Sequence, residues 1–255
     1  TAQRTAGYVA GAVLMVLAAP SVLPHIPAGR RGLAAGLMFT GVGIGVMSSG
    51  TLVPILLAQG LAATWTVLGG LAAVLSAIAW TGWPPAARPA ATVAAARSPR
   101  ALKALYVVYG LNAVGLVPHM VFLVDFIARG LGQGIATGAR YWVVFGLGAM
   151  LGPVLTGMAA DRVGFRAGVR VGLVLQAGLI GLLAFRHDAV SLFASSLVIG
   201  AFAPGIAQLV LGRLHELTSD ERLRRSGWSI ATVAFAVGQA ASAYLMSYVF
   251  ARTHG

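Results

Sequence analysis

Cysteine is absent from this sequence, and charged residues are scarce. The 255 residues contain no Cys, six Asp and Glu and 18 Lys and Arg, so that only 9% of the chain is charged. Without cysteine the chain has no disulfide and no thiolate metal site, and its redox compartment is left open. A soluble domain of ordinary composition carries about 25% charged residues. The shortage of charge therefore excludes an ordinary water-soluble domain.

Apolar residues and glycine take the place of the missing charge. Hydrophobic residues make up 58% of the chain, and there are 34 glycines. Glycines four residues apart, as in Gly32/Gly36 and Gly148/Gly152, let transmembrane helices approach closely. The net charge is +12, but the basic residues form short clusters between apolar runs rather than a stripe along one helix face, which argues against a nucleic-acid partner. We expect the outer surface to face lipid.

Eight apolar runs are long enough to cross a bilayer, whose core is about 30 Å thick and needs roughly 20 helical residues. They cover residues 5–24, 33–58, 61–83, 103–127, 134–159, 167–186, 188–212 and 227–251. The sequence therefore predicts an all-α, polytopic transmembrane helical bundle. The chain starts at Thr1, without Met or a signal peptide, and we expect it to be truncated.

The basic residues alternate between heavily and lightly charged loops. One predicted side of the membrane holds 13 of the 18, namely Arg30, Arg31, Arg88, Arg97, Arg100, Lys103, Arg162, Arg166, Arg170, Arg213, Arg222, Arg224 and Arg225. The other side holds Arg4, Arg129, Arg140, Arg186 and Arg252. Loops rich in Lys and Arg face the cytoplasm. We therefore expect the first side to be cytoplasmic. We also expect a multi-pass protein of a bacterial inner membrane.

Residues 84–102 differ from the other connections because they mix Pro, Ala and Arg without a helical apolar period. This composition predicts a cytoplasmic linker between two parts of the chain. The first part, 1–83, holds three predicted spans, and the second, 103–255, holds five. An unequal division of this kind is natural if spans are missing at both ends.

One short loop carries the most specific motif in the chain. Residues 157–166 form the string GMAADRVGFR, in which a small residue precedes Asp161-Arg162, a turn glycine (Gly164) and a further arginine (Arg166). It resembles the signature loop of the major facilitator superfamily. The passages 30–45, 115–132 and 142–153 resemble the YbfB/YjiJ-type branch of that superfamily.

This resemblance implies a secondary transporter whose two six-helix halves rock about a central site, often driven by protons. The predicted spans then correspond to helices four to six and seven to eleven of twelve, with the first three and the last absent. The resemblance leaves the solute open and implies no cofactor, and we expect a monomer. The loop residues Gly157, Asp161, Arg162, Gly164 and Arg166 are candidate gate residues, because loop charges can bind a neighbouring helix end in one conformation and release it in the other. The alternative is that the arginines of this loop only fix the orientation of the helices in the membrane, as basic residues in cytoplasmic loops do.

Asp125 is the only acidic residue inside an apolar run. A charge in the bilayer costs at least about 2.5–3.5 kcal/mol, which makes Asp125 a functional candidate. Arg129 lies four residues later on the same helix face and can pair with it. Asp125 then either exchanges protons or positions Arg129 for an anionic solute. The alternative for Asp125 and Arg129 is a purely structural pair near the outer membrane boundary. Arg140, at the start of the next predicted span, either pairs with Asp125 or contacts lipid head groups.

Several uncharged polar residues lie inside the other apolar stretches. Pro118 predicts a helix bend that frees a backbone carbonyl beside His119, and Asn112 lies seven residues earlier on nearly the same face. Each candidate is either part of the solute path or a packing partner between helices. Gln208 is preferred among the glutamines because Pro204-Gly205 predicts a helix break before it. The candidates are Asn112, His119, Gln176, Gln208, Gln239 and, on a weaker match, Arg4.

Enzymatic motifs are missing. The chain has no nucleophile with a base, no metal-spaced cluster and no phosphate-binding loop, and the glycines at 41–45 lie inside a predicted span without a preceding strand. We therefore expect neither an enzyme nor a metal or other cofactor. Two further hypotheses remain beside a proton-linked transporter: a membrane-embedded enzyme or receptor with a helical-bundle core, and a fragment unable to transport.

Overall fold

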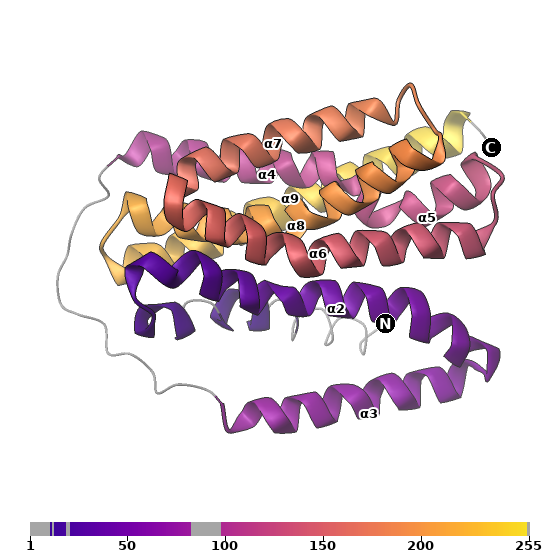
Figure 1. Ribbon diagram of the computed structural model, residues 1–255, viewed down its shortest axis with the longest axis horizontal. Helices are drawn as coiled ribbons and strands as arrows, with labels where there is room; N and C mark the ends of the chain where they lie inside the picture. The colour runs from indigo at the N-terminus through magenta and orange to yellow at the C-terminus, as the bar shows by residue number, and fades with distance from the viewer. Residues whose placement is uncertain (1–10, 12, 19–20, 83–97, 254–255) are drawn as a thin grey trace.

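The computed structural model describes residues 11, 13–18, 21–82 and 98–253, and within these it is an elongated bundle of helices without strands (Figure 1). Two short 3-10 helices, η1 (Leu23–His25) and η2 (Ala28–Arg30), precede the long elements. These are α2 (Arg31–Ala58), α3 (Leu61–Trp80), α4 (Pro99–Val121), α6 (Ile135–Val163), α7 (Phe165–Leu182), α8 (Ala189–Leu217) and α9 (Glu221–Thr253). A short α5 (Leu123–Asp125) and a π-helix η3 (Phe126–Gly130) connect α4 to α6. The all-α prediction is confirmed.

Seven helices among the described residues are long and apolar enough to cross a membrane. They correspond one to one to the last seven predicted spans. Residues 5–10, 12 and 19–20 of the predicted span 5–24 lie outside the described residues, as do Arg4 and residues 83–97 of the predicted linker.

Several helices extend further than their apolar runs, and α4, α8 and α9 show this clearly. Helix α4 starts at Pro99, four residues before the predicted start, with Ser98 as its N-cap and proline in the first turn, where its missing N–H is harmless. Helix α8 continues to Leu217, and α9 starts at Glu221. Hydropathy marks only the hydrocarbon thickness, whereas charged residues continue a helix into the aqueous boundary when they pair three or four residues apart. The ion pairs Arg213–Glu216 and Arg224–Glu221 are of this kind.

Close backbone contacts hold the centre of the bundle together. Helix α6 lies between α2 and α8, and α3 stands at the edge beside α2, with Thr64 as its only buried residue (Figure 1). Gly32 and Gly36 of α2 lie so close to α6 that an added Cβ would overlap Gly157 O and Pro153 O. Gly148 and Gly152 make equivalent contacts with α8. Both predicted glycine pairs are therefore packing surfaces, on opposite sides of α6.

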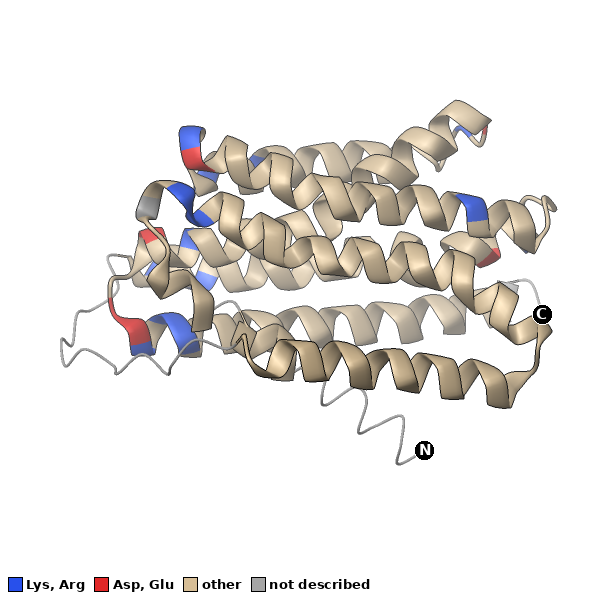
Figure 2. Cartoon of the chain, turned by 60° about the horizontal axis from the view of Figure 1, so that its bottom comes forward, with Lys and Arg blue, Asp and Glu red and all other residues tan. Residues whose placement is uncertain are grey.

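Charged residues gather at one end of the bundle (Figure 2). This end, called the basic end below, holds the first residues of α2, α7 and α9 and the last residues of α6 and α8. Gly32 of α2 contacts Asp161 of α6 there, and Phe165 of α7 contacts Glu216 of α8. The loops predicted to be rich in arginine thus meet in space.

Candidate functional site

A carboxylate joins α2 to α6 at the basic end. Asp161 Oδ1 accepts a hydrogen bond from Gly32 N at 2.9 Å, and Oδ2 accepts one from Leu33 N at 3.0 Å. The first N–H groups of a helix have no partner inside the helix, and its dipole favours a negative charge at this end. The predicted gate residue Asp161 therefore caps α2 from a position 129 residues along the chain.

The other residues of the predicted gate loop divide into two groups. Gly157 packs against Gly32, and Gly164 has φ +88°, a conformation that glycine adopts without strain and that lets α7 begin directly after α6. Arg162 and Arg166 are exposed, and in the part of the chain that the structure describes neither side chain has a hydrogen bond or an ion pair. Three of the five loop residues thus have a defined structural contact or conformation.

Gln208 ties α8 to the same region of α6. Its Nε2 donates to Pro153 O at 2.5 Å and to Thr156 Oγ1 at 2.8 Å, and the residue is 1% exposed. The predicted helix break before Gln208 is wrong, because α8 runs unbroken through Pro204. Residues 204–212 are all buried, so packing offsets the hydrogen bond that proline removes. In this conformation Gln208 links two helices.

His119 and Ser195 form a buried polar pair between α4 and α8. Their Nε2 and Oγ atoms are 2.5 Å apart, and His119 Nδ1 has no partner among the described residues. Asn112, two turns earlier on α4, is also buried, with Nδ2 unpartnered. Both candidates therefore lie in the packing of the bundle rather than on an open surface.

Helix α4 runs through Pro118 and is interrupted at Phe122, one turn later, where the chain continues as α5 and the π-helix η3. Pro118 leaves Val114 O without its usual donor, and Ser242 Oγ of α9 donates to this oxygen at 3.1 Å. The freed carbonyl exists as predicted, but a serine from another helix binds it.

Replacing Ser195 with alanine is expected to lower stability by about 1 kcal/mol, within the range measured for hydrogen bonds between transmembrane helices. The cause is that His119 Nε2 loses its partner in a buried position. Thermal unfolding in detergent measures the change. Ser229→Ala is the control, because that hydroxyl binds the backbone of its own helix. Equal midpoints for the two variants would contradict an interhelical role for Ser195.

Asp125 and Arg129 form the predicted ion pair, with Oδ1 and Nε 3.1 Å apart. Their side chains are 42% and 79% exposed, so the pair lies at the bundle surface. Sequence reasoning placed Asp125 within a continuous span, but the chain has left the regular helix at Phe122. Arg140 is exposed, and within the described residues it has no ion pair with Asp125.

The two remaining glutamines differ in their contacts. Gln176 on α7 is buried, and neither amide atom has a partner among the described residues. Gln239 Nε2 on α9 donates to Met120 Sδ at 3.7 Å. No group of three His, Asp or Glu is placed to hold a metal ion in the described part of the chain.

Sequence reasoning missed several polar contacts between helices. Trp142 Nε1 donates to Ser49 Oγ at 3.0 Å across the α2–α6 seam, and Trp228 Nε1 donates to Met15 O at 3.4 Å. It also missed a cavity at the basic end, where Arg31 and His215 meet. For the His119–Ser195 contact, the Ser195-Ser196 doublet inside an apolar span was a visible signal in the sequence.

The comparison with protein families agrees with the sequence motifs. Residues 2–255 match the family described as "Uncharacterised MFS-type transporter YbfB". A comparison with curated proteins gave no match. The family match covers nearly the whole chain, and the described part forms a bundle with seven helices able to span a membrane. The chain is therefore a multi-pass membrane protein and belongs to the YbfB-type transporters of the major facilitator superfamily.

Proposed function

We propose that the protein moves a small solute across a bacterial inner membrane by alternating access, acting as a monomer. The contact of Asp161 with the start of α2 carries this proposal, because it joins segment 1–83 to segment 103–255 through two hydrogen bonds at an aqueous boundary. Water can replace such bonds when the seam opens. We propose that the two segments are the moving parts and that the basic end, with the linker 84–102, faces the cytoplasm.

The α2–α6 seam suits such a movement from the basic end to its middle. The closest contacts there are glycine on backbone, at Gly32, Gly36 and Gly43, whereas further along the seam the Met47 side chain packs on Gly146. At the opposite end, the Trp142–Ser49 hydrogen bond offers a second contact. Opening the basic end breaks the Asp161 contacts while the tryptophan contact can persist. A seam with a separable contact at each end is what alternating access requires.

Solute-dependent proton movement in proteoliposomes tests the proposed function. Vesicles with an internal pH-sensitive dye receive small acids, amines and sugars one at a time. At least one solute is expected to change the internal pH faster than in protein-free vesicles. Finding no such solute, together with no counterflow of any labelled solute, would contradict the proposal.

We further propose that Asp125 exchanges the coupling proton and that Arg129 responds to its charge. The Asp125→Asn variant is then expected to lose proton-linked flux severalfold, because the amide neither releases nor accepts a proton at this position. Counterflow of labelled solute without a pH gradient should persist. The dye assay and the counterflow assay, performed on the same vesicles, measure the two properties.

Asp188→Asn provides the matched control. Asp188 caps α8, and the hydrogen bond from the Ser191 hydroxyl, with those from backbone N–H groups, lowers its pKa from the usual value. It therefore stays ionised near neutral pH, and asparagine preserves the cap. This variant should keep its proton-linked flux. Equal losses in the two variants would remove Asp125 from the coupling mechanism.

A further inference from the structure

A cavity of about 200 Å³ lies at the basic end, between α2 and α8. Its lining includes three apolar residues, Leu23, Ala35 and Phe165, and three polar ones, Arg31, His215 and Glu216. An engineered protein cavity of about 150 Å³ binds benzene. The space here is therefore large enough for a ring-sized molecule with a small polar head group.

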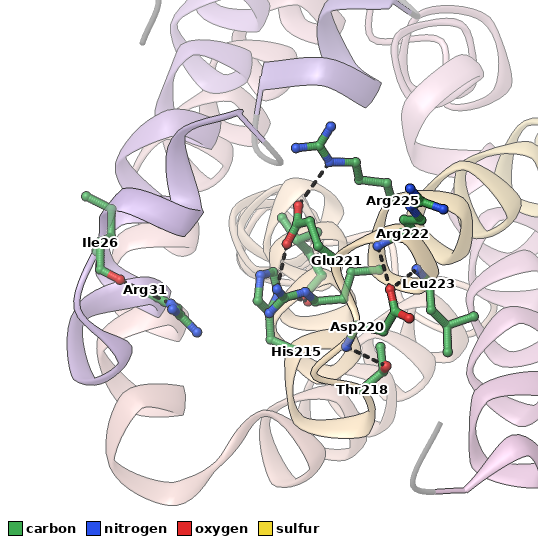
Figure 3. Close-up of polar contacts among 11 residues, drawn as sticks. Ile26, Arg31, His215, Thr218, Asp220, Glu221, Arg222, Leu223 and Arg225 are labelled. Carbon is green, nitrogen blue, oxygen red and sulfur yellow. Dashed lines mark hydrogen bonds and ion pairs between the residues drawn. The ribbon is translucent and has the colours of Figure 1, made fainter. Parts of the chain in front are cut away.

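Arg31 brings an unpaired positive charge to this cavity. Its Nε donates to Ile26 O at 3.2 Å, which fixes the guanidinium and leaves the two terminal nitrogens for another partner (Figure 3). Among the described residues Arg31 has no ion pair, although Arg213, Arg224 and Arg225 each have one. A guanidinium held in one orientation is well suited to bind a carboxylate or a phosphate.

The acidic residues nearby are already engaged. Asp161 binds the start of α2, and Glu216 accepts from Phe165 N and pairs with Arg213. Glu221 pairs with Arg224 and Arg225, and Asp220 caps α9 (Figure 3). The chain therefore supplies no free carboxylate for Arg31 within its described part.

His215 offers a second polar group to an occupant of the cavity. Its Nδ1 is 2.9 Å from Leu211 O, so this nitrogen carries a proton, and Nε2 remains for other contacts. The charged groups that face it include Arg31 on α2 and Glu221 on α9 (Figure 3). Arg224 on α9 also acts on it, and Glu216 of α8 lines the same cavity. A neutral His215 presents Nε2 as an acceptor, whereas a protonated one donates to an anion.

We infer that the cavity binds a small organic anion, with its carboxylate on Arg31 and His215 and its apolar body against Leu23, Ala35 and Phe165. Such an anion bridges α2 and α8, which belong to the two segments proposed to move. This inference rests on the proposed function, because it names the class of the solute. It adds that anion binding and protonation of His215 favour each other.

Benzoate and benzamide form a matched pair of probes, because they share one shape and differ in charge. We expect 10 mM benzoate to raise the unfolding midpoint of the detergent-purified protein, more at pH 5 than at pH 8. Benzamide should leave the midpoint unchanged. Arg31→Gln should weaken benzoate binding, measured by calorimetry, by about tenfold or more, because a charge-assisted hydrogen bond is lost. His215→Gln should abolish the pH dependence.

Arg222→Gln is the control variant, because it removes the same charge from an exposed position outside the cavity lining. It should bind benzoate as the wild type does. Equal weakening in Arg222→Gln and Arg31→Gln, or equal stabilisation by benzamide, would overturn the inference. If Arg31→Gln fails to fold, Arg31→Lys replaces it, and unchanged affinity in that variant would also count against the inference.

A displacement experiment distinguishes a lipid head group from a free small anion as the occupant of the cavity. Displacement of benzoate by short-chain phosphatidylglycerol, but not by its phosphatidylcholine counterpart, would assign the cavity to a lipid head group and overturn the inference. Binding is measured without a gradient, so it is independent of transport. Benzoate binding without flux of any solute would contradict the proposed function alone. Flux of other solutes without benzoate binding would overturn the cavity assignment alone.

Discussion

Replacing Gly43 with alanine is expected to destabilise the protein by about 3 kcal/mol, the upper end of what overpacking usually costs. An added Cβ would overlap Met150 N of α6 and would lie 2.5 Å from both Ala149 C and Met150 Cα. These are backbone atoms, so no side-chain rotation relieves the overlap. The two helices must separate at the middle of the seam. Unfolding in detergent, followed by tryptophan fluorescence, measures the loss.

Gly45→Ala on the same helix is the matched control. Apart from its own chain neighbours and the backbone of its own helix, no atom lies within 4 Å of a Cβ added there. Because alanine favours helix over glycine by about 1 kcal/mol, this variant should be as stable as the wild type or slightly more so. The same proteoliposome assay should show normal flux for Gly45→Ala and reduced flux for Gly43→Ala. Similar stability of the two variants would contradict the close α2–α6 contact.

The order of the seven long helices in the described part of the chain could be predicted because a bilayer imposes a length on every apolar run. The bilayer thickness does not determine at which residues the helices begin and end. Arg213 and Glu216 extend α8 beyond its apolar run by pairing with each other. Hydropathy scores these charged residues as loop. Their helical state depends on side-chain pairing and on the neighbouring helix α7, which binds Glu216 through Phe165 N.

The interruption of α4 shows a second limit of the sequence. Pro118 predicts an irregularity in α4. The residue at which the helix is interrupted depends on which groups bind the carbonyls that proline frees. Ser242 of α9 donates to Val114 O, and the helix ends one turn after Pro118, at Phe122. The donor lies 128 residues away from the acceptor, and no local pattern links them. The exposed position of Asp125 follows from this interruption.

The motif around Asp161 was visible in the sequence, whereas its partner was not. Two N–H groups at the start of α2 bind the carboxylate, and backbone groups have no sequence signature. The partnership of Arg31 and His215 was likewise not predicted. Arg31 was interpreted only as one of the basic residues on the cytoplasmic side, and His215 received no role. Their shared cavity exists only because α2 and α8 meet at the basic end. The sequence thus predicted individual polar residues as candidates, but it did not predict which of them contact each other in the folded protein.

Replacing Asp161 with asparagine is expected to open the basic end. The amide keeps the size of the side chain but removes the charge and one of the two acceptor oxygens. Hydrogen bonds to a charged group contribute about 1.5–3 kcal/mol each. Since 1.4 kcal/mol corresponds to a factor of ten, the open population should rise about tenfold to a hundredfold if open and closed states exchange. The thermal midpoint should change little in comparison, because both states are folded.

Cysteine labelling measures this opening without interference, because the chain has no cysteine of its own. Ala35 lines the cavity and is 3% exposed, so Ala35→Cys should react slowly with a water-soluble maleimide and about tenfold or more faster when combined with Asp161→Asn. Asp220→Asn is the control, since Asp220 caps α9 at the same end and has no contact with α2. Its labelling rate should match that of Ala35→Cys alone. If both asparagine variants accelerated labelling equally, the effect would come from lost charge at the basic end, and Asp161 would not be the contact that holds the seam closed.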